Sequence, residues 1–362
     1  MLNFQDYDRL PIVHFGFWRE TLQQWADQGH ISQEDASGWT DGNAPERAIN
    51  KQLGFDFNWH NTVGADFGLR PRFESKVLEE LPDGSRKVLN HDGVIVLQND
   101  DAGGIPAEID HLLKASEQWQ EFYLPRLQWS PQRAILSQDA HAKLYDTKRD
   151  YPLGLNCGSL LGRIRDWMGV TGLAYVQADE PLLFEEMIQT VADLCYRCTE
   201  AMLAMPDVTF DFGHFWEDIC FKNGPLINPQ VFKDKVAPGY RRISKLLSRH
   251  GIDLVSLDCD GKVDLLLPIW LEQGINIMFP MEVGTWDANI RPWREKYGRA
   301  IRGVGGMDKQ VFAYDRAAID SEIERLRPLI ALGGYLPCPD HRIPPNAKWD
   351  NVQYYCEQMR KI

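Results

Sequence analysis

From about residue 150 to the C-terminus, short apolar runs alternate with longer segments of helical periodicity. The runs that predict strands cover residues 153–157, 208–212, 254–257, 275–279, 300–304 and 335–336. Between them, apolar residues recur three and four positions apart and stop near glycines, as they do in helices. Strands that alternate with helices build parallel sheets from βαβ units. The sequence therefore predicts an α/β fold around a parallel sheet.

Residues whose side chains commonly act in catalysis or ligand binding follow the predicted strands. They are His214, Trp216, Glu217 and Asp218; Asp258, Cys259 and Asp260; Glu282 and Asp287; Asp308 and Lys309; and Cys338, Asp340 and His341. In a (β/α)8 barrel, or TIM barrel, active sites lie at the C-terminal ends of the strands. No G-x-G-x-x-G or Walker motif is present, which disfavours an open nucleotide-binding sheet. We therefore predict a TIM barrel with these residues at its mouth.

The first 150 residues are less regular. A strand-like run covers 12–17, an amphipathic stretch covers 21–28, and a loop-rich span follows. Residues 73–81, 86–89 and 93–98 predict a β-meander, with Pro82-Asp83-Gly84 as its first turn. We interpret the meander as an insertion or lid. The chain is thus predicted to be one barrel domain, 1–362, with an irregular part at 1–150 and regular βα units at 151–362.

Composition disfavours several kinds of partner and location. With 39 basic and 52 acidic residues, the net charge of −13 opposes binding to nucleic acid or anionic membranes. The N-terminus does not resemble a signal peptide and no run of about 18 apolar residues occurs, so we expect a cytoplasmic protein. The 7 cysteines suit reduced thiols better than a disulfide framework. We interpret Cys195-x-x-Cys198, inside a helical segment, as structural.

Several motifs resemble the uroporphyrinogen decarboxylase-like superfamily. They are Phe221-Lys222-Asn223-Gly224-Pro225-Leu226-Ile227, Asp258-Cys259-Asp260-Gly261, Pro280-Met281-Glu282, Gly305-Gly306-Met307-Asp308-Lys309, Gly333-Gly334-Tyr335 through Pro344-Pro345, and the opening Asp8-Arg9-Leu10-Pro11 with Trp18. The resemblance covers nearly the whole chain and is strongest after residue 205. It implies a (β/α)8 barrel with one of two chemistries. These are decarboxylation of tetrapyrrole acetate arms and methyl transfer involving corrinoid proteins, as in methylcobalamin:coenzyme M methyltransferases.

The resemblance also implies a metal site, with a departure in its ligands. Decarboxylases of the superfamily carry an N-terminal arginine-rich signature of the R-Q-A-G type, which this chain lacks. The methyltransferase branch has a zinc site of His-x-Cys in one strand-end turn and a Cys near the C-terminus. Here those places hold Asp258, Asp260 and His341, a ligand set that zinc also accepts. A register shift of one residue would instead offer Cys259 and Cys338.

The expected catalytic residues are Asp258, Asp260, Glu282, His214 and Glu217. Carboxylates that converge at a barrel mouth repel each other, which raises one pKa and makes that group a proton donor. Asp258 and Asp260 share one face of an extended strand. The alternative for this pair is that one of them caps a helix starting near residue 263.

His214 and Glu217 are three residues apart and share a face if a helix has begun there. Their alternative is a surface ion pair or a cap. Glu282 has the alternative of an ion pair with Arg291 or Lys309. We expect Asp340 to orient the ring of His341 in its proline-rich loop.

The expected substrate-binding residues are Trp18, Trp216, Trp286, Asp308 and Lys309. Indole rings that follow strands would wall a flat or methylated organic substrate. Asp308 and Lys309 have the alternative of pairing with each other. Farther along the chain, we expect Asp315 to cap the last long helix before Gly333-Gly334.

The resemblance implies a corrinoid-linked methyltransferase, and the residues above would supply its site. It would move a methyl group between a small substrate, such as a methoxylated one, and a cobalamin protein, with zinc as a candidate cofactor. A carboxylic acid would protonate the oxygen that remains when a methoxy carbon departs. The chain lacks an Asp-x-His-x-x-Gly signature, so the corrinoid is expected on a partner. The alternatives are a decarboxylase acting on a carboxylated small molecule or tetrapyrrole, and a carrier without catalysis.

Overall fold

A parallel sheet forms the centre of the computed structural model, which describes residues 1–99 and 106–362. The sheet has 7 strands in the order β15-β14-β13-β12-β9-β8-β3, and all neighbouring strands are parallel. The strands are β3 (Thr62–Val63), β8 (Gly154–Asn156), β9 (Phe212–Trp216), β12 (Val255–Asp258), β13 (Ile277–Met281), β14 (Arg302–Met307) and β15 (Tyr335–Pro339). The predicted α/β class and parallel sheet are confirmed.

Two short strands lie where the edges of this sheet approach each other. β1 (Val13–His14) and β2 (Phe57–Asn58) pair in parallel. β1 contacts β15, and Phe17 forms a parallel bridge with Ile343 just beyond these strands. β2 runs almost directly into β3. The fold is therefore TIM-barrel-like.

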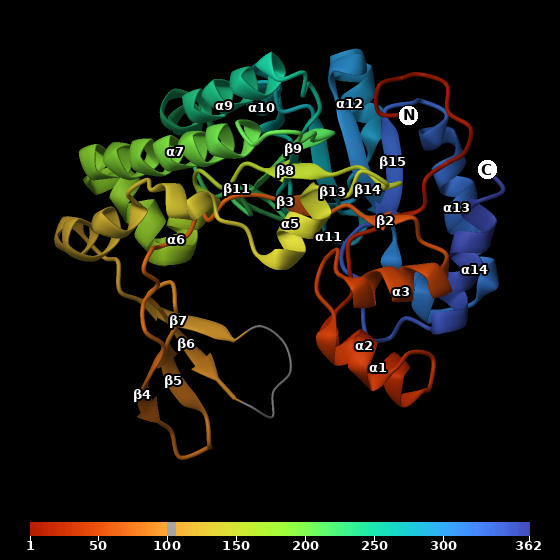
Figure 1. The fold of residues 1–362 in the computed structure, drawn as a ribbon, viewed down its shortest axis with the longest axis horizontal. Helices are drawn as coiled ribbons and strands as arrows, with labels where there is room; N and C mark the ends of the chain where they lie inside the picture. Colours follow the sequence, from red (N-terminus) through yellow and green to blue (C-terminus); the bar gives the residue numbers. More distant parts are fainter. Residues whose placement is uncertain (100–105) are drawn as a thin grey trace.

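Helices surround the sheet (Figure 1). They are α1 (Arg19–Asp27), α2 (Gln33–Gly38), α3 (Ala44–Leu53), α4 (Ser116–Gln118), α5 (Gln138–Leu144), α6 (Gly162–Asp179), α7 (Pro181–Leu203), α8 (Pro229–Val231), α9 (Ala237–Arg249), α10 (Leu267–Glu272), α11 (Val283–Trp286), α12 (Ile290–Tyr297), α13 (Arg316–Ile330) and α14 (Trp349–Met359). Short π or 3₁₀ turns are η1 (Trp119–Tyr123), η2 (Leu124–Leu127), η3 (Pro131–Ala134), η4 (Phe232–Val236), η5 (Gly298–Ala300) and η6 (Lys309–Ala313). Asp315 caps α13 as predicted, because its Oδ1 accepts from Ala318 N at 2.9 Å.

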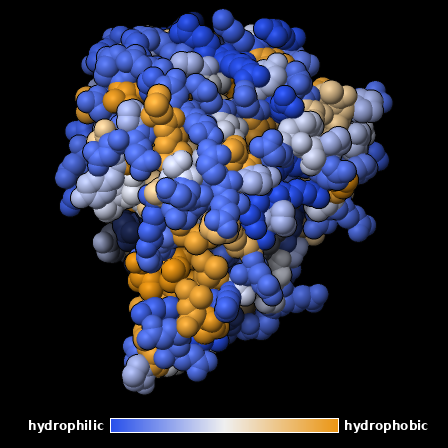
Figure 2. All heavy atoms as spheres, turned by 90° about the vertical axis from the view of Figure 1, so that its left-hand side faces the viewer, coloured by the Kyte–Doolittle hydropathy of each residue, from blue (hydrophilic) through white to orange (hydrophobic). Residues whose placement is uncertain are grey.

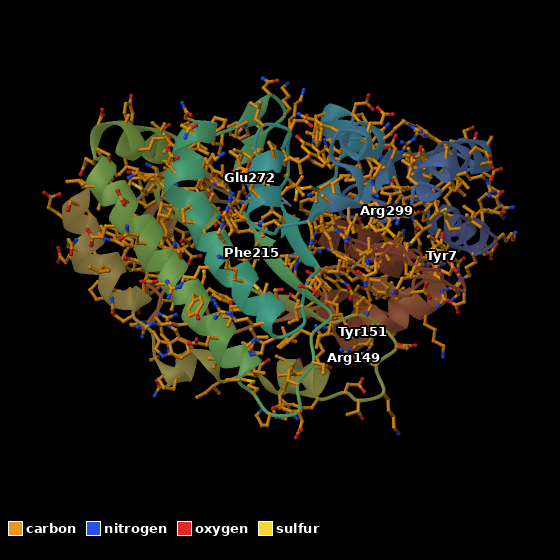
Figure 3. All side chains as sticks on the ribbon, turned by 90° about the horizontal axis from the view of Figure 1, so that it is seen from above. Tyr7, Arg149, Tyr151, Phe215, Glu272 and Arg299 are labelled. Atoms are coloured by element: carbon orange, nitrogen blue, oxygen red, sulfur yellow. The ribbon has the colours of Figure 1, made fainter. Side chains whose placement is uncertain are left out.

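Side chains of β9 alternate between the helix layer and the interior, as the pleat of a strand requires. Phe215 packs edge to face on Tyr240 of α9, with ring centroids 5.2 Å apart, and lies among the helices in Figure 3. Its neighbours His214 and Trp216 therefore point the other way and line a cavity at the strand ends. The pleat of β9 thus delivers both side chains to the barrel mouth.

The predicted strand boundaries were wrong by several residues in places. Residues 208–212 were predicted as a strand, but β9 spans Phe212–Trp216, and β13 and β14 also start later than predicted. His214 lies inside β9, so the shared helical face with Glu217 was wrong. The reason is that a polar residue within a barrel strand can face the interior. A prediction based on apolar runs therefore ends the strand before that residue.

The insertion is an antiparallel sheet of 4 strands in sequence order. Its strands are β4 (Lys76–Glu80), β5 (Arg86–Leu89), β6 (Val94–Gln98) and β7 (Ala107–His111). The predicted meander is confirmed for the first three. β7 was missed because its side chains are mostly exposed and contain no apolar run. The sheet projects away from the barrel (Figure 1), and Figure 2 shows an apolar area on the lower half of that side. The exposed large apolar residues of this four-stranded sheet are Val77, Leu78 and Ile109.

The cysteines match the expectation of reduced thiols, since all seven are free and buried. Cys195 and Cys198 both lie in α7, and neither belongs to a metal-binding group within the described ranges. In the same ranges, no helix combines the length and apolar character that crossing a bilayer requires.

Candidate functional site

Polar side chains from three strands meet at the C-terminal ends of the sheet. His60 follows β2, His214 lies in β9, and Asp258 is the last residue of β12. One potential ligand atom of each lies within 4.8 Å of the others. A second group with the same spacing consists of Asp218, Asp258 and Asp260. Asp258 belongs to both groups and is therefore the centre of the site.

The centre of the site is a close hydrogen-bonded pair. His60 Nε2 lies 2.7 Å from Asp258 Oδ2, and their side chains are 21% and 4% exposed. Burial opposes a charge on His60, but the hydrogen bond and negative charge of Asp258 outweigh burial and raise the His60 pKa. Burial also raises the pKa of Asp258, against the opposing effect of His60. The pair is therefore arranged to share a proton between the imidazole and the carboxylate.

His214 is a neutral imidazole with an unused nitrogen. The residue is 5% exposed, and its ring packs edge to face on His60 with centroids 5.6 Å apart. Burial, followed by the charge of His60, lowers the His214 pKa well below its ordinary value. Its buried Nδ1 has no hydrogen-bond partner within residues 1–99 and 106–362. A buried nitrogen without a partner is costly, so this atom is suited to bind a ligand.

Three carboxylates crowd together beside the histidines. Asp218 accepts a hydrogen bond from Asp260 N at 3.1 Å. Burial, followed by the charges of Asp258 and Asp260, raises the pKa of Asp218 to about 8. The Asp260 Oδ1 atom is buried and, among the described residues, without a hydrogen-bond partner. Such a cluster must hold protons or a cation, because three ionised carboxylates at this spacing repel strongly.

Asp260 extends the site toward two more of the predicted residues. His341 Nε2 lies 3.5 Å from Asp260 Oδ2, and the His341 ring stacks on Trp18 with centroids 5.7 Å apart. Glu282 accepts from Gly261 N at 2.6 Å and from Thr285 Oγ1 at 2.7 Å. Burial, followed by the charge of Asp260, raises the Glu282 pKa.

These contacts exclude two of the structural alternatives. Neither Asp258 nor Asp260 caps a nearby helix, since α10 begins at Leu267 without a side-chain cap. Within the described residues, Glu282 forms no ion pair with Arg291 or Lys309. The fold buries Asp258 and Glu282 at strand ends, which the local sequence does not show.

Glu217 faces a different environment from the other acidic residues. Its carboxylate accepts hydrogen bonds from Leu160 N at 2.6 Å, Leu161 N at 2.9 Å and Gly162 N at 2.6 Å. Burial raises its pKa, although these N–H groups oppose the effect. Both oxygens are thus engaged by the start of α6. The carboxylate anchors the loop between β8 and α6.

The expected link between Asp340 and His341 was wrong. Asp340 Oδ2 accepts from Val283 N at 3.0 Å and Gly284 N at 2.9 Å, and its Oδ1 lies 3.0 Å from Lys309 Nζ. Lys309 therefore pairs with Asp340 instead of Asp308. These bonds tie the loop after β15 to α11. They leave His341 to contact Asp260.

The remaining predicted residues divide between the cavity and other surroundings. Trp216 lines the cavity beside His60 and His214. Trp286 packs against Trp293 with ring centroids 5.9 Å apart. The Asp308 carboxylate accepts from Gln310 N at 2.9 Å and so caps η6. Trp286 and Asp308 do not line the cavity at the two histidines.

The donor set of the first group fits a transition metal. His60, His214 and Asp258 would supply two imidazole nitrogens and a carboxylate oxygen, which are zinc ligands and leave a fourth position open. The unpartnered Nδ1 of His214 supports this fit. The predicted ligands Asp258 and Asp260 lie together in the second group, whereas His341 belongs to neither.

The thiols offered by a register shift are poorly suited to bind a metal. Cys259 is 2% exposed and Cys338 is 0% exposed. Burial raises both thiol pKa values well above the ordinary range. Metal ligation requires a thiolate. Neither cysteine belongs to a ligand group in the part of the chain that the structure describes.

A cavity of about 230 Å³ lies over His60, His214 and Asp258. Its wall also includes Asn156 and Arg163. At ~30 Å³ per water, this volume corresponds to about eight waters. The site therefore suits a small ligand whose reacting atom rests on the histidines.

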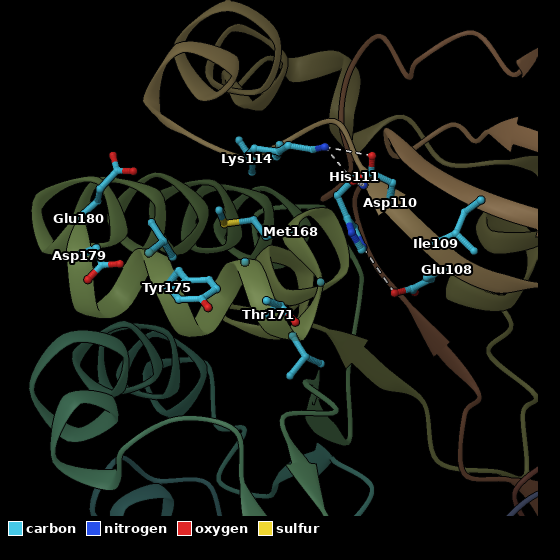
Figure 4. A pocket seen from close by; sticks show the side chains of 15 residues that line it. Glu108, Ile109, Asp110, His111, Lys114, Met168, Thr171, Tyr175, Asp179 and Glu180 are labelled. Atoms are coloured by element: carbon cyan, nitrogen blue, oxygen red, sulfur yellow. Dashed lines mark hydrogen bonds and ion pairs between the residues drawn. The ribbon is translucent and has the colours of Figure 1, made fainter.

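A larger cavity of about 600 Å³ lies between α6 and β7 (Figure 4). Four of its polar residues form two pairs. Lys114 Nζ lies 2.9 Å from Asp110, and His111 Nε2 lies 3.5 Å from Glu108. No member of the His60 or Asp218 groups lines it. It is thus separate from the candidate site.

Sequence reasoning missed three residues of the site. His60 follows a two-residue strand in the irregular part of the chain, where no periodicity marks a strand end. Asp218 was noted after a predicted strand but was not chosen. Its neighbour Glu217 was chosen instead. Arg163 is the second residue of α6, in a segment whose sequence is that of an ordinary helix. Only proximity in space identifies these three.

Comparisons with known proteins support the fold. No known family model matches the chain, and no curated protein sequence matches it. A solved methyltransferase from Methanosarcina mazei is similar over 99% of this chain and 96% of that chain, with a TM-score of 0.60 and 13% identity. A B12-independent methionine synthase from Shewanella sp. W3-18-1, solved with selenomethionine, is similar over 98% of both chains, with a TM-score of 0.47 and 11% identity. At such identity, the likeness concerns the fold.

Proposed function

We propose that this chain is a methyltransferase of the corrinoid-linked type. It would move a methyl group between a small substrate and a cobalamin carried by a partner protein. The observation that carries the proposal is the group of His60, His214 and Asp258 beneath a cavity of about 230 Å³. Two imidazoles and a carboxylate at the end of parallel strands form a donor set for a metal with an open position.

Two further observations support this reading. The fold resembles that of a methyltransferase over nearly the full length of both chains. The motifs around Asp258, Glu282 and Asp308 resemble the uroporphyrinogen decarboxylase-like superfamily, which includes corrinoid-dependent methyltransferases. We also propose that β1 and β2 close the sheet into a complete (β/α)8 barrel, since β1 lies against β15 and β2 leads into β3.

The site residues have distinct roles in the proposed reaction. His60, His214 and Asp258 would hold the metal, which when bound supplies a Lewis acid for the heteroatom that carries the methyl group. In the metal-free site, burial and the charges of Asp258 and Asp260 raise the pKa of Asp218 to about 8, so this carboxyl group can carry a proton at neutral pH. It would donate that proton to the substrate oxygen, which keeps the electron pair of the broken carbon–oxygen bond. The methyl carbon would take its new bond from the reduced cobalt of the partner's cobalamin. Proton donation of this kind contributes about 10²–10⁴-fold to a rate.

A decarboxylase remains the second candidate, and one observation favours it. Arg163 lines the cavity and would pair with a substrate carboxylate. A tetrapyrrole is much larger than a cavity of about 230 Å³, so the lyase reading applies to a small carboxylated molecule. Release of CO₂ from such a molecule, without methyl transfer, would select this candidate.

The test combines metal analysis with a spectroscopic assay. Purified protein is analysed for bound metal. It is then incubated with cob(I)alamin and methoxylated aromatic compounds, and methylcobalamin formation is followed by absorbance. We expect His214→Ala and Asp258→Asn to lose the metal and at least about 100-fold of the rate, because both remove ligands. His250→Ala, at the end of α9, is the control and should retain both. Full activity of both ligand variants would overturn the proposal.

A further inference from the structure

The lining of the cavity over the two histidines carries opposite charges. Its acidic wall is Asp258, which lies next to Asp218 and Asp260. Its basic wall is Arg163, near the start of α6. Arg163 shares a single carboxylate, Asp166, with Arg165, whose side chain lies outside the lining. The Nη1 atoms of Arg163 and Arg165 lie 3.5 Å and 3.2 Å from the two Asp166 oxygens.

The guanidinium of Arg163 is only weakly engaged by the protein. Its contact with Asp166 is 3.5 Å long, at the outer limit of a hydrogen bond. Among the described residues, Asp166 is the one hydrogen-bonding partner of this guanidinium. A guanidinium offers five N–H donors. Its side chain is 34% exposed and lines the cavity, so the remaining donors are available to a ligand.

Asp166 is shared between two cations, and Arg165 is the nearer of them, at 3.2 Å against 3.5 Å for Arg163. Asp166 is therefore better placed to neutralise Arg165 than Arg163.

A flat surface joins the two walls. Trp216 lines the cavity, and Arg163 Cζ lies 5.5 Å from the centroid of its ring. An aromatic ring beside an arginine binds flat anions well, because the ring contacts the apolar body while the guanidinium takes the charge. Trp216 also follows His214 by two residues on the same strand face. A molecule lying along Trp216 thus reaches from Arg163 toward His214.

We propose that Arg163 and Trp216 form a subsite for the carboxylate end of a small, flat substrate. The carboxylate would accept two hydrogen bonds from Arg163, and the ring would lie against Trp216. The opposite, methyl-bearing end would then face His60 and His214. The inference rests on the proposed function for the identity of that reacting end. The carboxylate subsite itself can be tested by binding alone.

The acidic wall favours this orientation of the substrate over the reverse one. A carboxylate placed near Asp258 and Asp260 would be repelled, whereas one placed at Arg163 is attracted. The small cavity volume limits the substrate to about one ring with its substituents. Methoxybenzoates have this shape and charge, and they serve as probes.

The test measures binding by calorimetry. Benzoate and 3-methoxybenzoate are compared with methyl benzoate and anisole, which have similar shapes and no charge. We expect the carboxylates to bind at least about 10-fold more tightly than the neutral compounds, since charge-assisted hydrogen bonds are the stronger kind. Absence of saturable carboxylate binding overturns the subsite.

Variants then locate the binding energy. Arg163→Gln should weaken carboxylate binding by about 10- to 100-fold and leave neutral compounds unchanged. Arg163→Lys should fall between, because lysine keeps the charge but not the paired donors. Arg249→Gln, at the end of α9, is the control. It removes one positive charge from a residue that does not line the cavity, and it should change binding by less than about 3-fold. Equal losses in both glutamine variants overturn the proposal. Thermal melts by circular dichroism check that each variant folds.

A metal chelator separates this subsite from the proposed function. Carboxylate binding at Arg163 should survive removal of metal, whereas a carboxylate that ligates the metal is released, which overturns the subsite. If methyl transfer is absent but binding depends on Arg163, the proposed function fails and the subsite stands. If neutral compounds are demethylated and carboxylates do not bind, the subsite fails and the proposed function stands.

Discussion

Two neighbouring regions of the barrel mouth surround a buried carboxylate with opposite environments: one supplies hydrogen-bond donors and the other supplies like charges. Beside α6, the Glu217 carboxylate accepts three backbone hydrogen bonds of 2.6, 2.9 and 2.6 Å. Beside β12, Asp218 accepts one backbone bond and stands next to Asp258 and Asp260. A carboxylate with its oxygens occupied stabilises the fold, whereas one crowded by like charges destabilises it. Adjacent residues of the same charge can thus belong to the scaffold and to the site.

Replacing Glu217 should give the largest change in stability. In Glu217→Ala, the buried N–H groups at the start of α6 lose their acceptor. Each unsatisfied group costs about 1–3 kcal/mol, so we expect the free energy of unfolding to fall by about 3–5 kcal/mol. Urea unfolding measures this loss. Glu217→Gln, which keeps one acceptor oxygen, should lose less. A loss below about 1 kcal/mol in the alanine variant would mean that water replaces the carboxylate and that the two regions are alike.

Replacing Asp218 should change stability in the opposite direction, and with pH. Its pKa is about 8 in the folded protein against 3.8 for the free group, so between these values the folded state binds more protons than the unfolded state. Wild-type stability relative to D218N therefore falls as pH rises through this window, by at most about 1.4 kcal/mol per pH unit. Asparagine tolerates the left-handed backbone found here, φ 45°.

We expect D218N to match the wild type near pH 4 and to exceed it by about 1–3 kcal/mol at pH 8. The measurement is urea unfolding in a chelating buffer across this range. Methyl transfer should fall in the same variant, because the amide cannot donate the proton of a carboxylic acid. Stability curves that run parallel at all pH values would show that Asp218 is not part of a strained cluster.

A residue outside both regions should give the smallest effect. Asp315 caps α13, far along the chain from the turn at Asp258. Asp315→Ala should lower the free energy of unfolding by about 1 kcal/mol with no dependence on cavity ligands, and Asp315→Ser should restore most of it. Methyl transfer should be unchanged. An activity loss in this variant would mean that a loss of stability anywhere in the fold lowers activity. The effects of the Glu217 and Asp218 variants could then not be assigned to their local surroundings.

The sequence by itself determined the class of fold and several local features. Alternating strand and helix patterns predicted the parallel sheet, and the Pro82-Asp83-Gly84 turn predicted the meander. The cap at Asp315 also follows from local chemistry. These features succeed because they depend on residues a few positions apart, where hydrogen bonds and apolar spacing can be read along the chain.

Only the tertiary structure decided which polar residues share the cavity. His60 and Asp258 are 198 positions apart and meet because β2 and β12 end on the same side of the sheet. The opposite surroundings of Glu217 and Asp218 depend on how the loop after β8 folds over β9, which no local pattern records. If the predicted alternation along a strand is shifted by one residue, every side chain is assigned to the wrong face. Sequence patterns locate strands with an error of several residues. The residues that line the cavity could therefore be identified only from the tertiary structure.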